Sequence, residues 1–266
     1  MLVVAENLNV MSAVIGAAMR ERQKAPIQEM ARRLVAAGAE VLDVNVGPGR
    51  KDGVAVMTFV VDTLAEAVSC QLCLDTVNDE AMEAGIVRCA DLGMPTPIVN
   101  SFSAQPDKLE RFLPLAAKYG CEIIGLTMER SIPVTAAERL SLAFDLVTAA
   151  NEAGVTNDRI FIDPVVLPLG VDVGQQHARA VQEVVASMPE MFDPPVRTIC
   201  GVSNVSNGAP AGLRPALNGV FMAMLSALGL DYAIGDALDP EFMRTARLAR
   251  AFKNLSLYSV ADAELQ

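Results

Sequence analysis

Small polar side chains follow the apolar run at 196–202, and they are the residues of this stretch that are best suited to chemistry. The run, VRTICGV, is β-branched and apolar without a helical period, which predicts a strand. The side chains that follow supply hydroxyls and amides: Ser203, Asn204, Ser206 and Asn207. A strand that delivers such groups at its carboxyl end is typical of the active-site end of a β/α barrel. Taken alone, the stretch is equally explained as a strand that runs into a polar turn.

The same pattern recurs along the chain, because carboxylates and amides stand at the ends of other apolar runs. They are Glu6, Asn7 and Asn9; Asp43 and Asn45; Asp75 and Asn78; Asn100, Ser101 and Ser103; Thr127; Asp163; and Asp236. This set contains no histidine or lysine, no His/Cys spacing of a transition-metal site, and no serine or cysteine with a triad base. A carboxylate can accept two parallel N–H bonds from an amino-pyrimidinone edge, and an amide can serve a neighbouring donor and acceptor. The pattern favours a flat, neutral, donor-rich heterocycle such as a pterin, and it predicts no metal site.

Structural interpretations of the same residues stay open at this point. Asp163 precedes Pro164 and is explained equally well as a turn residue. Asp75 could be the N-cap of the next helix. Asp43 and Asn45 could be polar barrel residues that bond to one another.

Eight strand-then-helix units predict the fold. The predicted strands are 2–5, 40–46, 71–74, 97–99, 122–126, 159–162, 196–202 and 232–234. The predicted helices are 26–37, 54–68, 79–90, 106–118, 135–153, 175–188, 214–228 and 240–254, with Gly past many helix ends and Pro near several starts. We therefore expect a single (β/α)8 TIM barrel of the α/β class that occupies 1–266 as one domain. An open doubly wound sheet is the alternative, but no GxGxxG follows the first strand.

The segments between these elements are expected to be loops. The stretches 47–53 (GPGRKDG), 103–106 and 170–174 follow predicted strands. The last residues, 261–266, are expected to form a loose tail.

Composition narrows the class of protein. The chain has 266 residues, a net charge of −11 and 52% hydrophobic residues, which indicates a large core and argues against nucleic-acid or anionic-membrane partners. The apolar runs are too short for a membrane span and no signal peptide opens the chain, so we expect a cytoplasmic protein.

The cysteines and the histidine are expected to be structural. Five scattered cysteines fit reduced core thiols. Cys70 and Cys73 form a CxxC without a second pair, and residues three apart on a strand point to opposite faces. The single histidine, His177, follows Gln175 and Gln176 and is expected at the surface.

Five motifs carry a resemblance that covers essentially the whole chain: LDVNVGP (42–48), LCLDTVN (72–78), PIVNSFS (97–103), FIDPVVLP (161–168) and GVSNVS (201–206). In order and spacing they resemble the pterin-binding barrel family, and more closely its methyltetrahydrofolate:corrinoid protein methyltransferases. The resemblance implies that an Asp, an Asn and a second Asp hold the pterin ring, and the matching residues are Asp75, Asn100 and Asp163. It also implies that Asn204 lies near the methylated nitrogen N5, with Ser203 in the same motif.

Asn207 lies where a folate-contacting amide is expected by the same resemblance. The chain departs from the methyltransferase pattern at Glu6-Asn7, where relatives commonly carry Glu-Arg. Dihydropteroate synthases of the same family carry a lysine at the seventh strand end and a basic pair near the eighth. This chain has Ser203-Asn204 and GDALDP (235–240) at those places, which argues against the synthase.

The expected function is methyl transfer between N5 of a tetrahydrofolate and the cobalt of a corrinoid, in either direction. Asn204 and Asp75 are the expected catalytic residues, with N5 activated by a proton or a strong hydrogen bond. The chain has no DxHxxG corrinoid motif, so the corrinoid is expected on a separate partner protein, and the resemblance implies a homodimer. Two alternatives remain: another pterin-binding enzyme, such as the synthase, or a non-catalytic folate-binding module.

Overall fold

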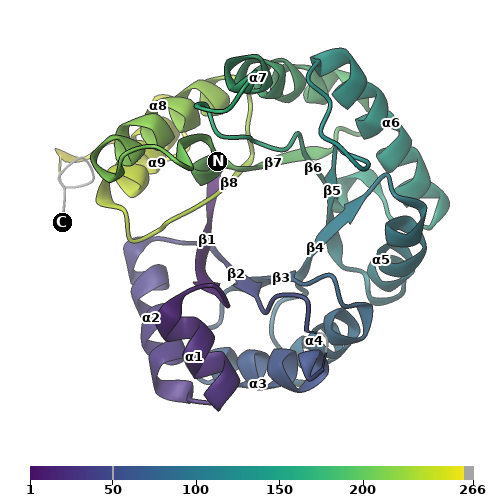
Figure 1. The fold of residues 1–266 in the computed structure, drawn as a ribbon, viewed down its shortest axis with the longest axis vertical. Coiled ribbons are helices and arrows are strands. Elements are labelled where there is room, and N and C mark those ends of the chain that lie inside the picture. The colour runs from purple at the N-terminus through teal and green to yellow at the C-terminus, as the bar shows by residue number, and fades with distance from the viewer. Residues whose placement is uncertain (50, 261–266) are drawn as a thin grey trace.

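A closed barrel of parallel strands forms the centre of the molecule, and helices surround it (Figure 1). The structure is a computed structural model, and it describes residues 1–49 and 51–260. Each strand pairs in parallel with the next, and the last strand pairs with the first. The expected (β/α)8 barrel is therefore confirmed.

The strands in chain order are β1 (Leu2–Asn9), β2 (Val41–Asn45), β3 (Gln71–Asp75), β4 (Ile98–Ser103), β5 (Glu122–Leu126), β6 (Ile160–Asp163), β7 (Arg197–Gly201) and β8 (Tyr232–Gly235). The helices are α1 (Ala13–Glu21), α2 (Lys24–Ala37), α3 (Gly53–Ala65), α4 (Asp79–Asp91), α5 (Pro106–Tyr119), α6 (Ala136–Glu152), α7 (Gly174–Met191), α8 (Arg214–Ala227) and α9 (Pro240–Phe252). Short 3₁₀ segments are η1 (Asn157–Arg159), η2 (Val202–Ser206) and η3 (Ala211–Leu213).

Helix α1 is an element that the sequence analysis missed. Ser12 caps it by accepting a hydrogen bond from the Ile15 N–H at 3.3 Å. A Cβ at Gly16 would lie 2.0 Å from the carbonyl oxygen of Val10, so only glycine allows the helix to lie this close to the end of β1. The signal was present, because Ile15, Ala18 and Met19 have helical spacing and are buried.

Strands β1 and β4 extend beyond their predicted ends, and so several expected strand-end residues lie inside the strands. The register of β1 against β2 shifts between Ala5 and Leu8, and that of β4 against β5 shifts between Asn100 and Phe102. Such irregularities redirect side chains and are common beside active sites. Here they occur where the polar residues of both strands begin.

The barrel interior is apolar at one end and polar at the other. Its buried apolar side chains are Val4, Val41, Cys73, Ile98, Ile124, Phe161 and Ile199. Side chains alternate along a strand, so the residue two positions later on each strand also faces the interior. On β1, β2, β3, β4 and β6 that residue is Glu6, Asp43, Asp75, Asn100 and Asp163. The sequence thus places a polar layer directly above an apolar plug.

All five cysteines are free thiols, and Cys73 belongs to the interior plug while Cys70 packs against the outer core. The expected opposite faces of the CxxC are confirmed. Among the helices of the described residues, none has the length and hydropathy required to cross a bilayer. The expected tail at 261–266 lies outside the described residues, as does Arg50 of the 47–53 segment.

Candidate functional site

The candidate site lies at the carboxyl ends of the strands, where three neighbouring strands hold polar residues in register. Asn45 pairs with Asp75 across β2 and β3, and Asp75 pairs with Asn100 across β3 and β4. Because parallel strands in register carry their side chains side by side, these three groups form one row facing the barrel interior.

Asp75 is held by the amide of Asn45. Asn45 Nδ2 donates to Asp75 Oδ2, and Asn45 Oδ1 accepts from the Gly47 N–H at 2.9 Å, which fixes the amide orientation. Among the described residues no donor reaches Asp75 Oδ1, so one carboxylate oxygen is left for a ligand. Burial raises the pKa of Asp75. The expectation that Asp75 is a helix N-cap is wrong, because Asn78 caps α4.

Asn100 is held from below by Asp43. Asn100 Nδ2 donates to Asp43 Oδ1 at 3.0 Å, and Asp43 is 4% exposed. Burial and the neighbouring Asp75 charge raise the pKa of Asp43, which also accepts a hydrogen bond from the Cys73 thiol. Asp43 is the more deeply buried of the two carboxyls, so it holds a proton more readily than Asp75. Asp43 and Asn45 do not bond to one another, contrary to the structural interpretation from sequence.

Asp163 ends β6 on the other side of the mouth. Its Oδ1 accepts a hydrogen bond from the Val165 N–H at 2.7 Å, so the turn role expected from Asp163-Pro164 is present. The side chain also faces the interior and is 8% exposed. Burial raises its pKa to about 6, against the opposing effects of backbone N–H groups and Arg139.

The polar residues after β7 form the turn η2 over the mouth. Ser203 Oγ donates to Glu6 Oε2 at 2.8 Å, and Asn207 Nδ2 donates to Asn204 Oδ1 at 3.2 Å. A Cβ at Gly201 would lie 2.8 Å from Asn204 Nδ2, so Asn204 folds back over the strand end. Asn204 and Asn207 are both exposed, which leaves them accessible to a ligand at the mouth.

Asn7, which stands where relatives commonly carry arginine, links β1 to the segment after β8. Its Nδ2 donates to Asp236 Oδ1 at 2.6 Å, and its Oδ1 accepts from the Ala237 N–H at 3.3 Å. A neutral amide therefore bridges the two strand ends, and no guanidinium is needed at this position for that contact.

The structure brings the expected residues to one end of the barrel in two groups. Asp75 and Asn100 lie in the β2–β4 row, while Ser203, Asn204 and Asn207 lie over β7 and β1. Among the described residues no hydrogen bond joins Asn204 to Asp75 directly. In that same part of the chain, no group of three or more His, Cys, Asp or Glu side chains is placed to hold a metal ion.

The expectation that His177 lies at the surface is wrong. It is 4% exposed, in the first turn of α7, and its Nδ1 contacts Nη2 of Arg139 on α6. Burial and the Arg139 charge lower the pKa of His177. Since a guanidinium only donates, Nδ1 is the acceptor and the ring proton is on Nε2. The Gln-Gln-His sequence looked polar, but the histidine falls on the inward face of the helix.

Arg139 itself was missed by the sequence analysis. It is fully buried, in line with the inward-facing Ala143, Leu146 and Ala150 of α6. A charged residue in the apolar stripe of an amphipathic helix is the signal that could have found it, because such a charge needs buried partners.

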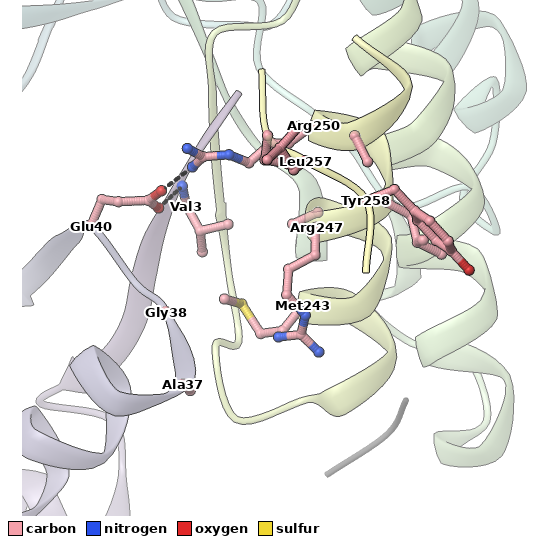
Figure 2. Close-up of a pocket in the computed structure, with 13 residues that line it drawn as sticks. Val3, Ala37, Gly38, Glu40, Met243, Arg247, Arg250, Leu257 and Tyr258 are labelled. Carbon is pink, nitrogen blue, oxygen red and sulfur yellow. Dashed lines mark hydrogen bonds and ion pairs between the residues drawn. The ribbon is translucent and has the colours of Figure 1, made fainter. Parts of the chain in front are cut away.

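A second cavity, of about 210 Å³, lies at the opposite end of the barrel (Figure 2). It lies between the start of β1, the end of α2 and helix α9, and Leu257 and Tyr258 line its rim. Glu40 in its wall is already bonded to Arg250 and to the Val3 N–H. Because this cavity is at the amino ends of the strands, it is separate from the polar row described above.

Carboxylates, amides and hydroxyls at one barrel mouth are the donor and acceptor set that a pterin ring requires. The pterin binding enzyme family matches residues 6–235, and the chain belongs to this family.

Three relatives were compared with the chain. It is 28% identical over 246 residues to a methylcorrinoid:tetrahydrofolate methyltransferase of Eubacterium limosum, covering 91% of this chain and 88% of that protein. It is 28% identical to a methionine synthase of Mycobacterium tuberculosis and 26% identical to one of Mycobacterium leprae, covering 85% and 77% of this chain. The matches cover only 19% and 17% of the two methionine synthases.

Proposed function

We propose that this protein transfers a methyl group between N5 of a tetrahydrofolate and the cobalt of a corrinoid. The observation that carries the proposal is the polar row of Asp75 and Asn100, with Asp163 across the mouth, in a barrel of the pterin-binding family. The relative from Eubacterium limosum, named for methyl transfer between these two substrates, aligns over nearly the whole barrel.

Asp75, Asn100 and Asp163 bind the pterin ring in this proposal. Asp75 Oδ1 and the carboxylate of Asp163 accept N–H groups of the amino-pyrimidinone edge. Asn100 donates to Asp43 through Nδ2, which fixes its amide and leaves Oδ1 and the second N–H for the ring. Ser203 and Asn207 contact the folate from the η2 side of the mouth.

The reaction breaks the N5–CH3 bond and forms a CH3–Co bond. The electron pair of the broken bond stays on N5, which takes up a proton, and Co(I) supplies the pair for the new bond and becomes Co(III). N5 of a tertiary amine is a poor leaving group, so the barrier falls only if positive charge on N5 is stabilised. The same groups serve the reverse transfer from a methyl-corrinoid to tetrahydrofolate.

Asn204 stabilises that charge. Its Oδ1 has two lone pairs, and Asn207 occupies one of them, which orients the amide and leaves the other for protonated N5. An amide gives up no proton at neutral pH, so the proton comes from solvent or from Asp75, whose pKa is raised by burial. Because Asn204 and Asp75 do not touch, a proton from Asp75 reaches N5 through water or the ring itself.

The alternatives are disfavoured by the residues at β7 and β8. A dihydropteroate synthase must neutralise a pyrophosphate leaving group, which needs cationic side chains. Here the corresponding places hold Ser203 with Asn204, and Asp236 bonded to Asn7. A non-catalytic folate-binding module would bind the ring without accelerating transfer, and the assay below separates it from an enzyme.

The corrinoid arrives on a partner protein that docks over the barrel mouth, because the chain has no DxHxxG motif. The whole chain, 1–266, acts as one domain in the cytoplasm, where its five free thiols stay reduced. The protein is a homodimer. Support comes from an apolar groove between α7 and α8, lined by Leu217, Phe221 and Met224, beside Val220, which is 63% exposed. Sedimentation of the wild type and Val220→Glu tests this assembly: a dimer that the variant dissociates supports it, and a monomeric wild type contradicts it.

The test of function is a visible spectrum. Methyltetrahydrofolate is mixed with cob(I)alamin and a catalytic amount of the protein, and loss of the Co(I) band is followed. Acceleration over the protein-free rate supports the transferase. Tight folate binding without acceleration would instead indicate the non-catalytic module, and synthase activity with a pterin pyrophosphate would indicate the synthase.

A further inference from the structure

Arg139 is fully buried, and its guanidinium gathers three backbone carbonyls and one imidazole. Nε donates to the Pro133 carbonyl at 2.8 Å, and Nη1 donates to the carbonyls of Pro164 and Val165 at 2.5 and 3.1 Å. Nη2 contacts His177 Nδ1. These partners lie on the β5–α6 connection, the segment after β6 and the start of α7, so one side chain ties three parts of the chain together.

Val165 is the residue through which this arrangement reaches the site. Its φ of +62° is in the left-handed region, which a β-branched residue adopts only when its surroundings impose it. The Val165 carbonyl accepts from Arg139 while its N–H donates to Asp163 Oδ1 at 2.7 Å. The peptide orientation that Arg139 holds at Val165 is thus coupled to the direction of the Asp163 carboxylate.

The same segment also touches the turn that carries Asn204. The Leu169 N–H donates to the Val205 carbonyl at 2.8 Å, and Val205 is the neighbour of Asn204 in η2. A shift of the segment after β6 therefore moves both groups that face the substrate from this side of the mouth.

We propose that Arg139, seated on the neutral imidazole of His177, is a positioning residue that fixes Asp163 and the Asn204 turn for pterin binding. This inference rests on the proposed function, because it assigns Asp163 and Asn204 to the pterin. It gives a role to the single histidine, which takes no part in the chemistry and acts as the acceptor that orients the guanidinium.

Arg139 also acts through its charge. Among the described residues, the ionisable groups whose charges act on Asp163 or are acted on by it are Arg139 on α6 and Cys200 on β7. Burial holds the pKa of the Cys200 thiol well above its usual range, so that thiol stays neutral. Arg139 is then the cation that opposes the effect of burial on Asp163, and it favours the ionised carboxylate that a pterin edge requires.

The test compares variants that separate charge from geometry. Arg139→Lys keeps the charge but loses the planar fork that reaches several carbonyls, whereas Arg139→Gln loses both. Arg159→Gln is the matched control, because Arg159 also donates to a backbone carbonyl, that of Gly154 at 2.9 Å, but lies before β6 rather than after it. Each variant is first checked for folding by thermal unfolding, and methyltetrahydrofolate affinity is then measured by calorimetry between pH 5 and 8.

Wild type is expected to bind folate, and Arg139→Gln to bind it at least about tenfold more weakly at pH 7. In Arg139→Gln the pH at which binding is half lost is expected to move up by about one unit, since the carboxylate is then harder to ionise. Arg139→Lys is expected to lose affinity with a smaller change in that pH, and Arg159→Gln to bind like wild type. A folded Arg139→Gln protein with wild-type affinity and pH profile, or an equal loss in Arg159→Gln, would overturn the inference.

His177 provides a second route if the Arg139 variants do not fold. His177→Leu removes the acceptor for Nη2 and is expected to weaken folate binding several-fold, while His177→Asn restores an acceptor and most of the affinity. Equal affinities in wild type and both His177 variants would overturn the clamp. A wild type that binds and transfers, with unchanged variants, sinks only this inference, whereas a wild type that binds no folate sinks the proposed function with it.

Discussion

Replacing Asn204 with alanine is expected to slow methyl transfer more than it weakens folate binding. Asn204 contacts N5, and its bond strengthens only when N5 becomes cationic, so its loss raises the barrier to the chemical step. A hydrogen bond to a charged group contributes roughly 1.4–3 kcal/mol, which corresponds to about a ten- to 150-fold lower rate. The fold should tolerate the change, because Asn204 is exposed and its side chain bonds only to the side chain of Asn207 among the described residues.

Two numbers on each variant decide the outcome. The folate dissociation constant comes from calorimetry, and the single-turnover rate at saturating folate comes from stopped-flow loss of the Co(I) band. Asn207→Ala is the matched comparison: it removes the amide that orients Asn204 but not the amide at N5, so its rate should fall less. If Asn204→Ala transferred at the wild-type rate under saturation, Asn204 would only bind the ring, and Asp75 would be the next group to test.

The remaining predictions concern binding. Asp163→Asn places a donor opposite a donor and should cost about 1.5–3 kcal/mol of folate affinity by calorimetry, with wild-type affinity contradicting the role of Asp163. Because burial raises the pKa of Asp163 to about 6 and the ring needs the ionised form, wild-type affinity should fall as the pH is lowered through 6. A pH-independent dissociation constant would contradict this, and in Asp163→Asn that fall should be absent. A chelator should leave transfer to free cob(I)alamin unchanged, because the described residues contain no metal-ligating cluster; activity lost with a stoichiometric metal would refute the scheme.

Much of the fold could be predicted from the sequence because strand and helix patterns alternate eight times. The strand boundaries were less predictable at β1 and β4, where the register shifts beside Glu6 and Asn100 depend on the neighbouring strands. Helix α1 was missed although Ser12 and its apolar spacing were visible.

The site residues could be located at the mouth because barrel strand ends converge there. Their partners could not be predicted, since a hydrogen bond from Asn100 to Asp43 joins residues 57 positions apart. The burial of His177 and Arg139 was missed for a related reason: each charge or ring is buried only because the other partner is there to satisfy it. Sequence periodicity reports which face of a helix is apolar, but not which polar side chain has a buried partner on another helix.

The central claim is that the methyl group itself passes from N5 to cobalt at this barrel mouth. The most direct measurement uses methyltetrahydrofolate with a ¹³C-labelled methyl group, cob(I)alamin and stoichiometric protein, followed by ¹³C NMR. The account predicts that the N-methyl signal is replaced by a cobalt-bound methyl signal in the presence of the protein, at a rate well above that without it. Label that remains on the folate at the protein-free rate, although the folate is bound, would contradict the account.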